Sequence, residues 1–120
     1  MDSAAPPPGA PAAAPSFEER FAALARDWRG HLPGRLADLR VRAAACRHDP
    51  QDSGGLEEFY RQAHMLAGSA GTFGLAVVGE RARELEAVLL RLMDMPSRAD
   101  TDFESVQEGL DALLAAAPRD

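Results

Sequence analysis

The sequence predicts an all-α protein, built as an antiparallel up-down four-helix bundle with an additional short N-terminal helix. Apolar residues recur at three- and four-residue steps along most of the chain, which is the spacing of helices with one buried face. No stretch alternates apolar and polar residues, and β-branched residues are scarce, so we expect no strand. Apolar faces spaced in heptads and joined by short loops pack best between antiparallel neighbours.

Composition suits one small acidic domain. The chain has 120 residues, of which 46% are hydrophobic, enough for a single core. Its net charge is −6 and no basic run is present, so we expect neither a nucleic-acid nor a membrane partner. We find no membrane-spanning stretch and no signal-peptide pattern, and therefore expect a cytoplasmic protein. We also expect a monomer. All 13 basic residues are arginines, which together with the many alanines favours a GC-rich bacterial source.

The N-terminal part of the sequence predicts a disordered tail followed by two helices. Residues 1–15 are rich in Ala and Pro and have no periodicity, which predicts a disordered segment before a domain over residues 16–120. Ser16 and Glu19 form the pattern of a capping box, so a short helix should run from about Phe17 to Arg29 and cap one end of the bundle. A second helix should begin near Pro33 and end near His48, before the sequence Asp49-Pro50. Cys46 lies on its apolar face and should be a buried free thiol.

Three further helices complete the prediction. The segment from Asp49 to Gly55 has the composition of a turn, and the helix after it contains His64 and ends at Gly74. A long helix should then run from Leu75 to about Leu92, with Asp94-Met95-Pro96 ending it. The pair Thr101 and Glu104 suggests another capping box, followed by the last helix up to Pro118.

The histidine helix carries the pattern that points to function. Its apolar face places His64 about 115° from the centre of that face, so the imidazole should be exposed. Ala67, Gly68 and Gly71 follow on the same flank and leave almost no side chain beside the ring. Glycine inside a helix costs about 1 kcal/mol relative to alanine, so stability does not explain these residues. Two structural explanations stay open, namely close helix packing through small residues and a helix that ends near Gly68.

The run His64-Met65-Leu66-Ala67-Gly68-Ser69-Ala70, with Phe73-Gly74 after it, resembles the signature of histidine-containing phosphotransfer (HPt) domains. That pattern has a His, an apolar residue two positions on, usually a Lys at the third position, then Gly, a small residue and an aromatic-Gly pair. The Lys is missing here, because position 67 is Ala.

The resemblance implies that His64 accepts a phosphoryl group and that Gly68 lets a partner approach the ring. The implied partners are response-regulator receiver domains and a hybrid histidine kinase, in a bacterial two-component phosphorelay with Mg²⁺ held by the receiver. A neutral imidazole is a competent nucleophile near physiological pH, which agrees with this role. Ala67, Gly68, Gly71, Arg61 and Tyr60 are the candidate docking residues. Arg61 could hydrogen-bond to phosphate oxygens, or it could be an ordinary exposed arginine.

Other chemistry finds no support in the sequence. The helical neighbours of His64 include no metal ligand, so we expect no metal site and no cofactor. The one-turn neighbours Tyr60 and Arg61 supply no carboxylate for a catalytic pair. No Gly-rich phosphate loop is present, so the protein should carry phosphate without nucleotide-dependent kinase activity of its own. An alternative function is a helical adaptor that binds a receiver or a histidine kinase without being phosphorylated.

Overall fold

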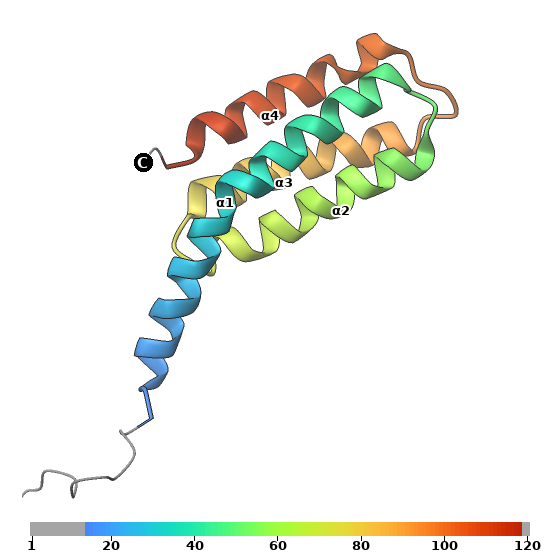
Figure 1. Ribbon diagram of the computed structural model, residues 1–120. Helices are drawn as coiled ribbons and strands as arrows, with labels where there is room; N and C mark the ends of the chain where they lie inside the picture. The colour runs from blue at the N-terminus through green and yellow to red at the C-terminus, as the bar shows by residue number, and fades with distance from the viewer. Residues whose placement is uncertain (1–13, 119–120) are drawn as a thin grey trace, which may run out of the picture.

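The computed structural model describes residues 14–118, which form four α-helices and contain no strand (Figure 1). These are α1 (Phe17–His48), α2 (Ser53–Ala70), α3 (Ala76–Met93) and α4 (Glu104–Ala116), with a 3₁₀ turn η1 (Asp100–Phe103) before α4. The all-helical prediction is therefore confirmed. The predicted disordered tail falls almost entirely on residues 1–13, which lie outside the described residues.

The helices lie side by side, and each runs in the direction opposite to the one before it (Figure 1). Their apolar faces meet in one core, which includes the free thiol of Cys46 as predicted. The largest fully buried side chains come from all four helices; they are Phe59, Leu39, Leu56, Leu85, Leu89, Leu110, Leu113, Val78 and Val106. None of the helices between residues 14 and 118 is long and apolar enough to cross a bilayer.

The separate N-terminal helix was a wrong prediction, because residues 17–48 form one continuous helix through Gly30 and Pro33. The two predicted apolar faces are in phase, since Trp28 and Leu32 are one turn apart and both are buried. Pro33 lacks an N–H and its ring crowds the preceding turn, which bends a helix without ending it when packing compensates. In Figure 1 the axis of α1 changes direction between its blue first part and its teal second part.

The first part of α1 is attached to the rest of the protein through Phe73, in the turn after α2. The Phe73 ring lies 5.5 Å from the ring of Trp28 and 5.7 Å from that of Phe21, measured between ring centroids. The Arg29 guanidinium donates a hydrogen bond to the Phe73 carbonyl over 2.8 Å. These contacts hold the first part of α1 to the turn after α2, but this part extends beyond the bundle instead of covering its end as predicted (Figure 1).

Side chains cap two helix starts. Ser16 accepts a hydrogen bond from the Glu19 amide, and Glu19 accepts one from the Ser16 amide, so the first capping box is confirmed. The start of α2 corrects the predicted turn, because Gly54 and Gly55 already belong to the helix. Asp52 is the N-cap there, and its carboxylate accepts from the Gly55 amide over 3.1 Å.

The end of α2 is formed by Gly74, which has a positive φ of 86°. The Leu75 amide donates to the Ala70 carbonyl and the Gly74 amide donates to the Gly71 carbonyl, the pair of bonds that makes a Schellman motif. A left-handed residue is needed at this position, and glycine adopts it without a steric penalty. Regular helix ends at Ala70, but the predicted role of Gly74 in ending the segment agrees with this geometry.

The predicted capping box at Thr101 is wrong. The Ala99 amide instead donates to the Asp102 carboxylate over 2.8 Å, and η1 occupies Asp100–Phe103 before α4 begins. The short Asp side chain can reach an amide three residues back, and this bond favours a tight turn over a regular helix start. Phe103, at the end of this turn, is buried in the core.

Arg98 is a buried charged residue that joins two loops at the far end of the bundle. Its guanidinium donates to the carbonyls of Pro50, Leu92 and Met95 at 2.7, 3.2 and 3.4 Å, and to the Ser53 hydroxyl at 3.3 Å. Gln51 adds hydrogen bonds to the backbone amide and carbonyl of Arg98. The loop before α2 and the loop before η1 are therefore fixed to each other.

Candidate functional site

The His64 side chain lies on α2 and is 63% exposed, in agreement with the orientation predicted from the apolar face. Ala63 and Leu66, its neighbours on that face, are buried in the core. The imidazole stacks on the ring of Tyr60, one turn earlier, with 5.7 Å between ring centroids and 20° between ring planes. One face of the imidazole is thus covered, and its edge is open to solvent.

A carboxylate lies beside His64, contrary to the sequence prediction that none was near. The Nδ1 atom of His64 is 2.5 Å from Oε2 of Glu86, which lies on α3 and is 17% exposed. Helical spacing identifies only neighbours on the same helix, whereas Glu86 comes from the adjacent antiparallel helix. His64 and Glu86 therefore form a hydrogen-bonded pair at the surface between α2 and α3.

This pair determines which ring nitrogen can react. An ionised carboxylate can only accept a hydrogen bond, so Nδ1 of His64 must carry the proton and donate to Glu86. In the neutral ring Nε2 then holds a free lone pair, and no hydrogen bond engages it within residues 14–118. The geometry thus leaves an exposed, nucleophilic nitrogen held in one orientation.

Tyr60 takes part in the same cluster. Hydrogen bonding to the Glu86 carboxylate, reinforced by burial and by its negative charge, raises the pKa of the Tyr60 hydroxyl. The hydroxyl therefore stays protonated near neutral pH. Its half-buried ring also packs against the core, so Tyr60 lies between the core and the imidazole.

The small residues near His64 do not all lie where the sequence placed them. Gly68 and Gly71 are exposed, and a methyl group added to either would meet no atom within 4 Å. Ala67, by contrast, is buried against α3, so its predicted place on the exposed flank is wrong. Gly68 leaves open space one turn from the imidazole, while Ala67 has a packing role.

Packing between α2 and α3 explains Ala67. The backbone of α3 approaches α2 closely at Gly79, where an added Cβ would lie 3.6 Å from the Ala67 carbonyl, 3.7 Å from Ala70 Cβ and 3.4 Å from the Gly71 amide nitrogen. Small residues on both helices permit this approach. Close packing, which the sequence analysis left open as an explanation for the small residues, thus accounts for Ala67 but not for Gly68.

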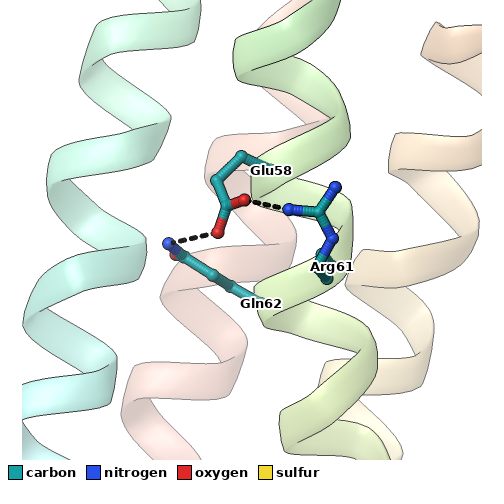
Figure 2. Close-up of polar contacts among 3 residues, drawn as sticks. All are labelled: Glu58, Arg61 and Gln62. Atoms are coloured by element: carbon teal, nitrogen blue, oxygen red, sulfur yellow. Dashed lines mark hydrogen bonds and ion pairs between the residues drawn. The ribbon is translucent and has the colours of Figure 1, made fainter.

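Arg61 lies one turn before His64 but is engaged elsewhere. Figure 2 shows its guanidinium against the Glu58 carboxylate, which also accepts a hydrogen bond from the amide of Gln62 at 3.4 Å. The Arg61 side chain is exposed, and such surface ion pairs contribute little stability. The guanidinium can therefore leave Glu58 for a stronger anion, but it does not contact His64.

Sequence reasoning missed Glu86 and Gly79. Glu86 directly follows Leu85 of the apolar stripe, so its place at the edge of the buried face could be read from the sequence. Its position opposite His64 could not be read, because this depends on how far α3 is shifted along α2. Gly79 carried a signal, since a glycine inside a strong apolar helix often marks a close approach of two backbones.

Comparison with known families gives an independent result. A family model described as "Hpt domain" matches residues 17–117, which include every helix of the structure. No curated protein matched the chain in a search, and no solved structure matched it either. Hpt domains are helical and act in phosphotransfer within two-component phosphorelays, where they interact with receiver domains and histidine kinases. Since the match covers most of the sequence, the chain belongs to the Hpt domain family.

Proposed function

We propose that the protein carries a phosphoryl group on Nε2 of His64 between aspartates of receiver domains in a bacterial, cytoplasmic phosphorelay. The observation that carries this proposal is the pair between Nδ1 of His64 and Glu86, which leaves Nε2 exposed with a free lone pair. The family match supports phosphotransfer as the reaction class, and an exposed nucleophilic nitrogen is suited to that reaction.

The proposed step begins with attack of Nε2 on the phosphorus of an aspartyl phosphate. A P–N bond forms, the P–O bond to the aspartate breaks, and the aspartate leaves as a carboxylate. The ring keeps its proton on Nδ1 and becomes cationic, so the charge of Glu86 stabilises it. Transfer to the next receiver reverses these changes. Mg²⁺, bound by the receiver, would shield the phosphoryl charge on the other side.

Docking would use the exposed surface of α2 around the imidazole. Gly68 and Gly71 have no side chains that project from this surface, so a receiver domain can bring its aspartate close to Nε2. Arg61 would turn from Glu58 toward the phosphoryl oxygens, in place of the lysine that many relatives have where this chain has Ala67. Tyr60 would limit movement of the ring.

The experiment combines the protein with a phosphorylated receiver domain, Mg²⁺ and labelled phosphate. The expected product is label on this chain that is lost in acid and kept in base, as for phosphohistidine. His64→Gln should fold normally and take up no label, whereas His31→Gln and His48→Gln, which alter the other two histidines, should take up label like the wild type. Binding of the receiver without any label would instead show a non-phosphorylated adaptor.

A further inference from the structure

The first part of α1 exposes an apolar surface that no other helix within residues 14–118 covers. In Figure 1 this blue part of α1 extends beyond the bundle formed by the other helices. Phe17 is 71% exposed, Leu24 is 59% exposed and Phe21 is 36% exposed. Large apolar side chains exposed singly are common, but a contiguous group on one helix face marks an interaction surface.

These side chains form a stripe with heptad spacing. Phe17, Phe21, Leu24 and Trp28 recur at steps of four and three residues, which is the seam of two helices packed together. Phe73 covers the stripe only on the side of Phe21 and Trp28. Phe17 and Leu24 remain open on the other side, so one more helix can pack there.

Two residues of opposite charge lie along the edge of the open side. Arg20 and Asp27 are seven residues apart, so both lie on the same flank of the stripe. Together with Ala23 and Leu24 they line a shallow hollow whose surface is mostly apolar. Asp27 also lies 3.7 Å from the Nδ1 atom of His31, and both of these side chains are exposed.

We propose that this surface, formed by Phe17, Arg20, Phe21, Leu24 and Asp27, pairs with the same surface of a second copy of the chain. The two helices run antiparallel about a two-fold axis between Ala23 and Leu24. Leu24 of one copy then packs against Phe21 of the other, and Phe17 reaches the outer edge of Trp28. Such a dimer differs from the monomer expected from the sequence.

Charge complementarity identifies a second copy as the occupant. In the antiparallel arrangement the Arg20 flank of one helix meets the Asp27 flank of the other, and two-fold symmetry makes the contact twice. A parallel pair would instead leave Arg20 and Asp27 about 10 Å apart along the axis, because seven residues rise by that length. The surface is thus complementary to itself in one orientation. It shares no residue with the His64 cluster, so the pairing is independent of the proposed function.

The test measures self-association of the full chain by analytical ultracentrifugation over a range of concentrations. Wild type should form a dimer, and Leu24→Asp should raise its dissociation constant by at least about tenfold. Arg20→Asp alone and Asp27→Arg alone should each weaken the dimer by a similar factor, because each creates two like-charge contacts. All three positions are exposed, so the variants should melt like wild type at concentrations where wild type is monomeric.

Two charge-swap arms test the orientation. The double variant Arg20→Asp/Asp27→Arg should dimerise within about threefold of wild type, because opposite charges meet again. An equimolar mixture of the two single variants should also associate, as a heterodimer only. The proposal would be overturned if wild type stays monomeric at concentrations up to about 1 mM. A dissociation constant above that value corresponds to a binding free energy of less than about 4 kcal/mol. Dimers that form but are not restored by either swap would overturn the antiparallel pairing.

Discussion

The Nδ1 atom of His64 on α2 and the Oε2 atom of Glu86 on α3 lie 2.5 Å apart, and this contact follows from how the two helices are aligned. The two backbones lie close together at Gly79, where an added Cβ would be 3.4 Å from the amide nitrogen of Gly71. Seven residues back along α2 from Gly71 is His64, and seven residues forward along antiparallel α3 from Gly79 is Glu86. Two helical turns separate each glycine from its polar partner, so the close approach aligns the pair.

Removing the charge of Glu86 should slow phosphorylation of His64. Glu86→Gln keeps an oxygen that accepts from Nδ1 but no longer stabilises the cationic ring, and we expect uptake from a phosphorylated receiver to slow about tenfold. Glu86→Ala also loses the hydrogen bond that fixes the tautomer, and should slow it further. Rapid-quench time courses measure both rates. Glu84→Gln is the matched control, because Glu84 lies on the same helix but pairs with Arg81. Uptake by Glu86→Ala at the wild-type rate would remove Glu86 from the mechanism.

Substitutions at Gly68 should affect the stability of the fold and the rate of phosphoryl transfer in opposite directions. Gly68→Ala should raise the free energy of unfolding by about 0.5 to 1 kcal/mol, because an added methyl group meets nothing and alanine favours the helix. Gly68→Gln should also fold, yet its longer side chain one turn from the imidazole should slow transfer from the receiver at least about tenfold. Thermal melts paired with transfer rates measure both effects. If Gly68→Gln transfers as fast as wild type, the receiver does not dock on this surface.

The size of the side chain at position 79 should determine the distance between α2 and α3, and through it the rate of transfer to His64. Gly79→Ala places its methyl group at ordinary contact distances and should fold at least as well as wild type. Gly79→Leu should cost about 1 to 3 kcal/mol through overpacking and move α3 away from α2, so that transfer to His64 also slows. Gly30→Leu is the control, since nothing lies within 4 Å of a Cβ there. Urea unfolding and transfer assays on all three variants test this. An unchanged transfer rate in Gly79→Leu would show that helix separation does not position Glu86.

Burial of Cys46 should make stability fall at alkaline pH. Burial is the main cause that raises the pKa of this thiol. The native state therefore holds the thiol proton more tightly than the unfolded chain, so stability declines as pH rises above the unfolded pKa of about 8.5. Urea unfolding at pH 7.5 and at pH 9.5 should show this decline for wild type and a smaller one for Cys46→Ala. Iodoacetamide should label the native thiol far more slowly than the denatured one. Equal labelling rates would mean that this end of the core opens readily.

The sequence was informative wherever a feature depends on one helix. The exposure of His64, the buried thiol of Cys46 and the left-handed turn at Gly74 after α2 all follow from local spacing or backbone preference. Contacts between helices were not accessible in this way. Ala67 was expected on the surface because the breadth of the buried face depends on how closely α3 approaches, and the sequence alone does not give that distance.

The long α1 shows a different source of error. Gly30 and Pro33 are local signals that usually end a helix, and they favoured two helices joined near residue 31. Continuous burial from Trp28 through Leu32 to Leu36 offsets the hydrogen bond that proline removes. Tertiary packing thus overrode a local preference in this helix.

The guanidinium of Arg98 ties the loop before α2 to the loop before η1 through backbone carbonyls of both. Opening either loop would leave this buried cation without its acceptors, which costs more than breaking a hydrogen bond between neutral groups. The two loops should therefore open together, as one cooperative unit. In native-state hydrogen exchange, amides at this end of the bundle would share one opening free energy, although they belong to loops more than forty residues apart in the sequence.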